Sequence, residues 1–186
     1  MDLKEEKKLI KQAQKNPEIF TKLYEEYYSK IFNYILKRVA NIEIAQDITS
    51  ETFFNALKKL NKFKWQNISF SAWLYRIANN EIVNYYRKNK HYISLEKLKD
   101  EKGFEPIVLH NPEKEFLEAQ EKLKKYVDFL EIQDKINKLP IKYQEVIMLR
   151  FFEKKEIKEI CEILGKKEGT VKSLIHRGLE KLRDLL

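Results

Sequence analysis

The stretch Ile157–Leu186, IKEICEILGKKEGTVKSLIHRGLEKLRDLL, decides the fold of this chain. Its apolar residues recur at helical spacing up to Leu164, Gly165 interrupts the pattern, and a second periodic run begins at Val171. Two helices joined by a short glycine-containing turn are typical of a helix-turn-helix, whose second helix enters the major groove of DNA. An ordinary helical hairpin with a solvated charged face would show the same periodicity.

The first turns of the second helix favour the DNA-binding interpretation. They combine short hydroxyl side chains with long cationic ones, which can reach base edges and phosphates. The candidate DNA-contacting residues are Lys167, Glu168, Thr170, Lys172, Ser173, His176 and Arg177. Because these polar residues cluster at the helix start, and not only along its outer face, the pattern indicates a recognition helix.

Composition predicts an all-α protein. Only four glycines and four prolines occur in 186 residues, which argues against a sheet-rich, turn-rich fold. The single cysteine, Cys161, excludes an internal disulfide, and the three histidines show no zinc-site spacing. No apolar run is long enough to cross a bilayer, and the N-terminus is too charged for a signal peptide. We therefore expect a cytoplasmic protein without membrane insertion, metal or cofactor.

The net charge of +8 is concentrated in two segments. Residues 58–90 carry eight Lys or Arg against one acid, a net charge of +7, and residues 166–186 carry six against three, a net charge of +3. Clustered positive charge is the electrostatic footprint of nucleic-acid binding. The second segment contains the presumed recognition helix.

Periodicity predicts two small helical domains joined by a linker. No helical period persists between His91 and Pro112, so the sequence divides into domains 1–90 and 113–186 with a linker at 91–112. The expected helices are Leu3–Lys15, Glu18–Val39, Ile42–Leu60, a helix capped by Ser69 or Ser71 that ends near Lys88, Glu113–Lys138, Ile141–Phe152 and the two helices of the motif.

The basic segment combines cations with aromatic and amide side chains, as single-stranded DNA binding requires. The unpatterned loop Lys62–Ser69 is a natural pocket for an unstacked base, and Trp65 within it is expected at the surface. Trp73 falls on the apolar stripe of the following helix, where a core position is expected.

Taken together, these segments resemble a bacterial sigma factor of the extracytoplasmic-function type, in the sigma-70 family. AQDITSETF (Ala45–Phe53) is similar to the acidic helix that binds core RNA polymerase, and FSAWLYRIANNEIVNYYRK (Phe70–Lys88) to the helix that handles the melted minus-ten element. LPIKYQEVIMLRFF (Leu139–Phe152) with EICEILGKKEGTVKSLIHRGLEKLR matches the domain that reads the minus-thirty-five element. The two motifs, in order and separated by a linker of suitable length, make the resemblance specific.

The resemblance implies partners and site residues. The partners are core RNA polymerase (its beta-prime clamp helices and beta flap), promoter DNA and an inhibitory anti-sigma factor. The residues implied to bind core polymerase are Asp47, Ser50, Glu51 and Asn55. Those implied to bind the minus-ten element are Lys62, Lys64, Trp65, Asn67, Arg76, Asn80, Asn84, Arg87 and Lys88. The seven residues of the recognition helix are implied to read the minus-thirty-five element.

Some positions depart from the family pattern. Lys154-Lys155-Glu156 stands where a glycine-led turn and a hydroxyl cap are common, so a different cap is expected for the first helix of the motif. Cys161 and Gly178 replace alanines, and Asn84 replaces an aspartate.

Two other functions fit parts of the sequence. A polymerase-independent transcriptional regulator would use the same helix-turn-helix, and an interaction protein would bind RNA through its basic domain. An enzyme is not expected, because the sequence has no Gly-rich phosphate loop, no nucleophile–base pair and no carboxylate cluster facing a predicted pocket.

Overall fold

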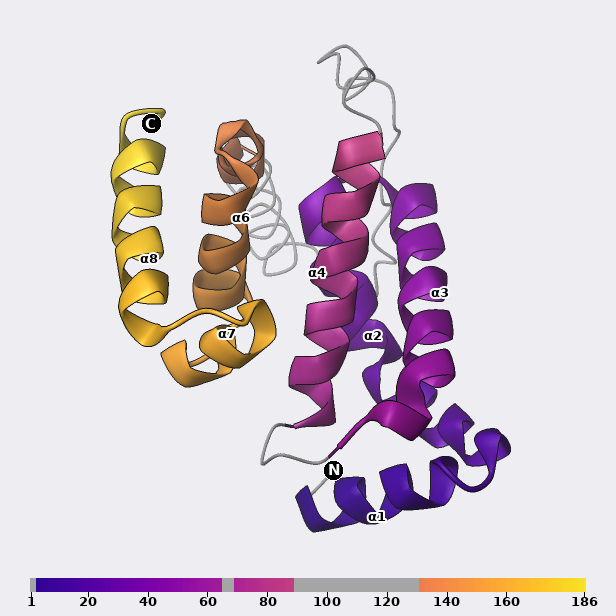
Figure 1. Ribbon diagram of the computed structural model, residues 1–186. Helices are drawn as coiled ribbons and strands as arrows, with labels where there is room; N and C mark the ends of the chain where they lie inside the picture. Colours follow the sequence, from indigo (N-terminus) through magenta and orange to yellow (C-terminus); the bar gives the residue numbers. More distant parts are fainter. Residues whose placement is uncertain (1–2, 65–68, 89–130) are drawn as a thin grey trace, which may run out of the picture.

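The computed structural model describes residues 3–64, 69–88 and 131–186, and every regular element within these ranges is helical (Figure 1). The predicted all-α fold is confirmed. The linker predicted at 91–112 and most of the helix predicted from Glu113 lie outside the described residues.

The described residues of the N-terminal half form four α-helices. They are α1 (Leu3–Ala13), α2 (Phe20–Val39), α3 (Ile42–Lys59) and α4 (Phe70–Lys88), with 3-10 turns η1 (Pro17–Ile19) and η2 (Leu60–Lys62) between them. Helices α2, α3 and α4 lie side by side, and α1 crosses beneath one end of them (Figure 1). Their apolar stripes meet in a core that includes the fully buried Leu23, Ile31 and Leu74. Burial of these stripes against one another is the main stabilising contribution to the bundle.

Local caps set the helix boundaries in this half. Ala40 ends α2 in the left-handed conformation, with a φ of 51°, and the Asn41 side chain accepts a 2.8 Å hydrogen bond from the Ile44 amide to begin α3. Of the two serines expected to cap α4, Ser69 does so, because its Oγ accepts a 3.2 Å hydrogen bond from the Ala72 amide. The predicted boundaries of α2 and α3 therefore agree with the structure to within two residues.

The C-terminal half contains a helix at 131–138, α6 (Ile141–Ile147), a π-helical turn η4 (Met148–Phe152), α7 (Ile157–Leu164) and α8 (Glu168–Arg183). The sequence predicted one continuous helix over Ile141–Phe152, whereas the structure widens its last five residues into the π-helical turn. Gly165 ends α7 at a φ of 63°, where a residue with a Cβ would be strained.

The start of α7 bears out the expectation of an unusual cap. Glu156 occupies the N-cap position, and the Glu159 carboxylate accepts a 2.9 Å hydrogen bond from the Glu156 amide. Lys154, just before it, adopts a left-handed φ of 52°. A lysine thus occupies a conformation that favours glycine.

The two halves touch through α4, which faces α7 across the molecule (Figure 1). Among the described residues, side-chain hydrogen bonds and the ion pair of Lys37 with Glu153 join them. Helix α4 therefore belongs to the N-terminal core on one side and to the contact between halves on the other.

Candidate nucleic-acid interface

The start of α8 is exposed to solvent along its whole candidate face. Lys167, Glu168, Thr170, Lys172, Ser173, His176 and Arg177 are all exposed, as a recognition helix requires. The opposite side of α8 is buried: Val171 is inaccessible, and a Cβ on Gly178 would lie 3.1 Å from the Ile147 Cδ1 of α6. Close packing on α6 thus turns the polar first turns of α8 outward.

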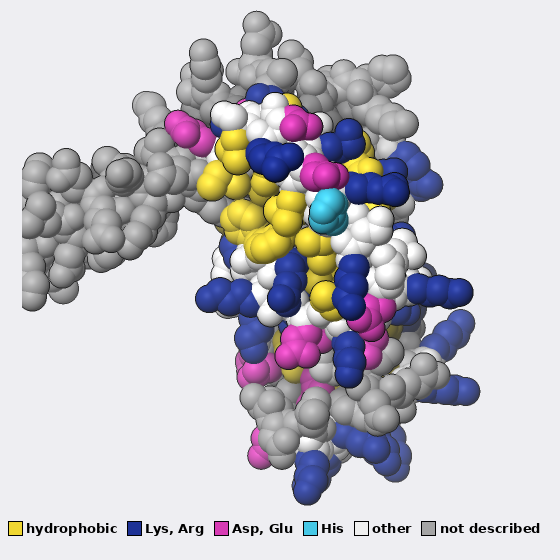
Figure 2. Space-filling view, turned by 90° about the vertical axis from the view of Figure 1, so that its left-hand side faces the viewer, with side chains coloured by type: hydrophobic (Ala, Val, Ile, Leu, Met, Phe, Trp, Pro, Cys, Tyr) yellow, Lys and Arg dark blue, Asp and Glu magenta, His cyan; other side chains and the backbone are white. Residues whose placement is uncertain are grey.

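Charge on this face is mixed but mainly positive. Lys172 Nζ lies 2.6 Å from Glu168 Oε1 on the same helix, and this ion pair raises the pKa of Lys172 and lowers that of Glu168. Figure 2 shows the face that carries α8, with lysine and arginine side chains projecting around a group of hydrophobic side chains. Leu179, 41% exposed, is among the apolar residues of this helix that remain accessible.

A second polar stripe runs along α4. Arg76, Asn80, Asn84 and Arg87 follow one another at intervals of four, four and three residues, which places them on one side of the helix. Arg76, Asn80 and Arg87 are exposed, Asn84 is half-buried, and Arg87 donates a 3.2 Å hydrogen bond to Asn84 Oδ1. Four of the residues predicted to bind the minus-ten element therefore share one face.

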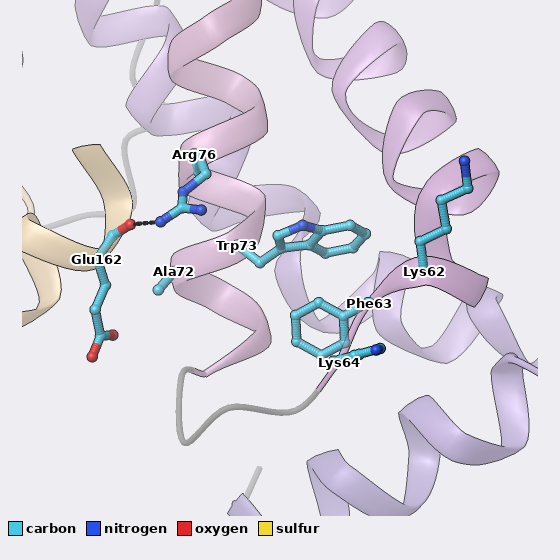
Figure 3. A pocket seen from close by; sticks show the side chains of 7 residues that line it. All are labelled: Lys62, Phe63, Lys64, Ala72, Trp73, Arg76 and Glu162. Atoms are coloured by element: carbon cyan, nitrogen blue, oxygen red, sulfur yellow. Dashed lines mark hydrogen bonds between the residues drawn. The ribbon is translucent and has the colours of Figure 1, made fainter. Parts of the chain in front are cut away.

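A hollow of about 230 Å³ opens at the N-terminal end of α4 (Figure 3). It is lined by Lys62, Phe63, Lys64, Ala72, Trp73, Arg76 and Glu162. The ring of Trp73 lies 4.8 Å from Phe63 and 5.3 Å from Phe70, centroid to centroid, so the aromatic side chains form one continuous wall. An aromatic wall beside cations can hold an unstacked base above a phosphate.

The hollow changes the interpretation of Trp73. The sequence placed this side chain in the core, but it is half-buried and contributes one face to the hollow. Trp65 and Asn67, also predicted for this site, lie outside the described residues. Lys62, Lys64 and Lys88 are exposed, as contact with the minus-ten element would require.

Arg76 is also held from the other half of the chain. Its guanidinium donates to the carbonyl oxygens of Glu162 and, at 3.3 Å, Ile163, near the C-terminal end of α7 (Figure 3). A cation near a helix C-terminus interacts favourably with the helix dipole. In this conformation, α7 covers part of the predicted minus-ten face.

The outer face of α3 carries the predicted polymerase-binding residues. Asp47, Ser50 and Glu51 are exposed, and the half-buried Asn55 donates a 2.8 Å hydrogen bond to Glu51 Oε1. Phe54 is 60% exposed on the same helix and was not singled out from the sequence. Helical periodicity alone assigned Phe54 neither to the buried nor to the exposed face of the helix. A large aromatic side chain among exposed carboxylates is the signal that could have identified it.

The sequence analysis also missed two residues that join the halves. Glu153 accepts hydrogen bonds from Lys37 and Tyr75, and Asn79 donates a 3.0 Å hydrogen bond to Glu145. Nothing in their local sequence distinguishes these polar residues from solvent-facing ones, because their partners lie 66 or more residues away.

In the described part of the chain, no group of three or more His, Cys, Asp or Glu side chains could hold a metal ion, and no helix is long and apolar enough to cross a membrane. Cys161 is half-buried, and burial, together with the nearby Glu168 carboxylate, raises the pKa of its thiol.

Comparison with known families and proteins agrees with this geometry. Residues 23–92 match the family model of sigma-70 region 2, and residues 129–182 match that of sigma-70 region 4. The chain is 37% identical to the ECF RNA polymerase sigma factor SigW of Bacillus subtilis, covering 97% of this chain and 96% of that protein. It is 31% identical to the ECF RNA polymerase sigma factor BldN of Streptomyces coelicolor over 96% of this chain, which spans 64% of the length of BldN.

Solved structures show the same fold at lower sequence identity. CnrH in complex with the cytosolic domain of CnrY superposes with a TM-score of 0.67 at 20% identity, covering 97% of this chain and 96% of CnrH. The sigma factor RpoE from Bartonella quintana, in complex with the anti-sigma factor NepR, gives a TM-score of 0.62 at 20% identity and covers 89% of this chain and 95% of RpoE.

Proposed function

Because the chain belongs to the extracytoplasmic-function sigma factors of the sigma-70 family, we propose that it binds core RNA polymerase and directs promoter-specific initiation of transcription. It does so by contacting a minus-ten and a minus-thirty-five element. The polymerase carries out RNA synthesis, and this chain contributes promoter recognition and strand opening without a catalytic activity of its own. In this proposal it acts in the cytoplasm, together with the polymerase.

One observation carries this proposal: α8 presents seven exposed polar residues at its start while its other side is buried on α6. Side chains so placed can enter a major groove without rearrangement of the helix pair. In our proposal these residues contact the minus-thirty-five element. The α4 stripe and the aromatic hollow supply the minus-ten contacts, with Arg76 and Arg87 on phosphates.

Protein partners use other faces. We assign Asp47, Ser50, Glu51 and Asn55 of α3 to the beta-prime clamp helices of the core polymerase, and the C-terminal half to the beta flap. The corresponding domain division is 1–90, 91–112 and 113–186. Since RpoE was solved with an anti-sigma factor, we also propose that an inhibitory polypeptide of this kind binds the present chain.

The deciding experiment is transcription in vitro with purified core polymerase and a template library. The library carries randomised minus-ten and minus-thirty-five segments at fixed spacing, so that no target promoter need be known in advance. We expect transcripts only when the full chain is added, and sequencing of the transcribed templates should recover two preferred elements.

Two other results would contradict the proposal. Unchanged core activity together with tight duplex binding by the chain alone would identify a polymerase-independent regulator. Binding to RNA in preference to both duplex and fork DNA would identify an RNA-binding interaction protein.

A further inference from the structure

Helix α1 precedes the segment matched by the region 2 family model, which begins at residue 23, yet it is firmly attached to the bundle. Ile10 and Ala13 are buried, and the Tyr27 hydroxyl donates a hydrogen bond to the buried Glu6 carboxylate. Burial and this carboxylate raise the pKa of Tyr27, so its hydroxyl stays protonated and able to donate. The exposed side of α1 is therefore held in a defined place.

That exposed side is basic. Lys8, Lys11 and Lys15 line a hollow of about 450 Å³ together with Gln12 and Gln14. Lys8 and Lys11 lie nearly one turn apart on α1, about 4.5 Å along its axis, and Lys15 follows in the turn after the helix. The exposed Glu5 lies at the far, N-terminal end of the helix.

Gln14 connects this hollow to the predicted minus-ten site. Its Nε2 donates 2.9 Å hydrogen bonds to the carbonyl oxygens of Leu60 and Phe63, which bracket Lys62. Phe63 lines the aromatic hollow, and the exposed Lys62 and Lys64 line it too. The chain just after α1 therefore contacts the Leu60–Phe63 segment, which carries Lys62, although about 50 residues separate them in the sequence.

We propose that Lys8, Lys11 and Lys15 bind the phosphate backbone of promoter DNA beside the minus-ten element, and that Gln14 fixes this surface to the base-binding hollow. This inference rests on the proposed function. Ammonium groups on flexible stems act as point charges on phosphates and do not read base edges. The contact is therefore independent of sequence, and its occupant is DNA because the lysines lie next to Gln14, which is hydrogen-bonded to the segment whose cations line the hollow.

The test measures open-complex formation by the holoenzyme across a salt series. The variant carries Lys8→Gln, Lys11→Gln and Lys15→Gln, and the control carries Lys30→Gln, Lys138→Gln and Lys142→Gln, three exposed lysines elsewhere. Each lost phosphate contact reduces the slope of log K against log salt by about 0.7 to 0.9. We expect a reduction of about 2 to 3 for the variant, equal on promoters of different sequence, and none for the control.

Each alternative result has a distinct meaning. If wild-type holoenzyme forms no promoter complex, the proposed function itself fails. If wild type forms it and the variant keeps the wild-type slope, only the role of α1 is wrong. If the variant binds core polymerase more weakly but keeps the wild-type slope of log K against log salt, the α1 surface binds a protein partner. That result would also overturn the inference.

A second, independent observation concerns the contact between the halves. Glu153, which follows the π-helical turn, lies with Oε1 2.9 Å from Lys37 Nζ and accepts a 2.7 Å hydrogen bond from the Tyr75 hydroxyl. Burial and Glu153 raise the pKa of Tyr75, which keeps this donor protonated. Lys155 Nζ lies 5.0 Å from the centre of the Tyr75 ring.

Further hydrogen bonds cross the contact. Asn79 donates to Glu145, Gln133 donates a 2.5 Å hydrogen bond to the Lys37 carbonyl, and Arg76 donates to the end of α7. Polar contacts of this kind are typical of interfaces within a chain that open and close.

The dimensions of this closed form are incompatible with binding both promoter elements at once. Two elements about 25 base pairs apart are separated by roughly 85 Å of duplex, at about 3.4 Å per pair. A compact chain of 186 residues has a radius of gyration of only about 16 Å. Moreover, Arg76 cannot hold the α7 carbonyls and a DNA phosphate at the same time.

We infer that the contact of α4 with α7 and Glu153 is an autoinhibitory latch, which holds the free chain closed and must open before both elements are bound. This inference also rests on the proposed function. Glu153→Gln should weaken the latch, because it removes the charge facing Lys37 but no residue of the DNA-binding faces. Glu25→Gln is the matched control, since Glu25 is exposed on α2 and belongs neither to the latch nor to a DNA-binding face.

Two measurements on the free chain test the latch. Small-angle scattering should give a radius of gyration near 16 Å for wild type and Glu25→Gln, and a larger value for Glu153→Gln. Fork DNA carrying the selected minus-ten element should bind Glu153→Gln about fivefold or more tightly than wild type. An already expanded wild type, or equal behaviour of Glu153→Gln and wild type in both measurements, would overturn the inference.

Discussion

At the scale of single residues, positive φ angles mark the positions where the backbone is strained. Ala40 and Lys154 both hold a positive φ, near 50°, as does Gly165 at 63°. For an L-residue with a Cβ, the left-handed conformation costs roughly 1–2 kcal/mol, and glycine avoids it. Lys154 is the position where the resemblance to the family anticipated a glycine-led turn.

Replacing Lys154 with glycine should therefore stabilise the fold. We expect Lys154→Gly to raise the free energy of unfolding by about 1 kcal/mol, measured by urea denaturation. Lys154→Ala keeps the Cβ and should leave that free energy within about 0.5 kcal/mol of wild type. Conversely, Gly165→Ala should lower it by about 1 kcal/mol or more. Equal effects of the glycine and alanine variants at position 154 would show that the backbone there is not strained.

Residues of α8 allow a test of base and phosphate contact. Arg177→Ala should weaken minus-thirty-five binding by roughly 1–3 kcal/mol, measured by titration of holoenzyme on duplex promoter DNA. Lys172→Ala should weaken it less, because Lys172 already pairs with Glu168. Lys181→Ala, exposed farther along the same helix, is the control. Unchanged binding by both Arg177→Ala and Lys172→Ala would mean that the reading face lies elsewhere.

At the scale of helices, periodicity and caps predicted most of what the structure contains. The bounds of α2 and α3, the cap of α4 and the break at Gly165 follow from local chemistry, which a sequence displays directly. The π-helical turn could not be predicted in this way, because its residues continue the apolar period of α6. The exposure of the α8 candidates and the shared face of the α4 candidates were predictable for the same reason, since helical spacing fixes both.

The acidic face of α3 can be tested as a unit. Asp47→Lys should reduce the affinity for core polymerase, measured by competition with a labelled sigma factor, because it places a cation on the proposed docking face. The fold should be unaffected, since Asp47 is exposed. Glu43→Lys, on the first turn of the same helix, is the control for charge alone. Normal association of Asp47→Lys would remove this residue from the site.

At the scale of the whole molecule, Asn79 links three segments. Its Oδ1 accepts hydrogen bonds from Tyr34 and from the buried Arg38, and its Nδ2 donates to Glu145 of the other half. No local pattern predicted this arrangement, because its members meet only after both halves have folded. An unpaired buried polar group is costly, and Arg38 Nε and Nη2 already have no hydrogen-bond partner in the described part of the chain.

We therefore expect Asn79→Ala to be strongly destabilising. It should lower the free energy of unfolding by about 3 kcal/mol, since it leaves polar groups on both sides of the contact unpaired. Its neighbour Asn80 is exposed, and Asn80→Ala should change the same quantity by less than about 0.5 kcal/mol. Thermal or urea unfolding of the pair measures the difference. Similar losses for both variants would mean that the buried network contributes little.

The position of α4 between the two halves limits how promoter preference can change. Most residues of this helix serve the core, the facing half or the aromatic hollow, so few can be exchanged without a second effect. The polar residues at the start of α8 make no hydrogen bond to the N-terminal half among the described residues. Divergence to new target genes, whether natural or engineered, is therefore expected to proceed more readily through the upstream element than through the downstream one.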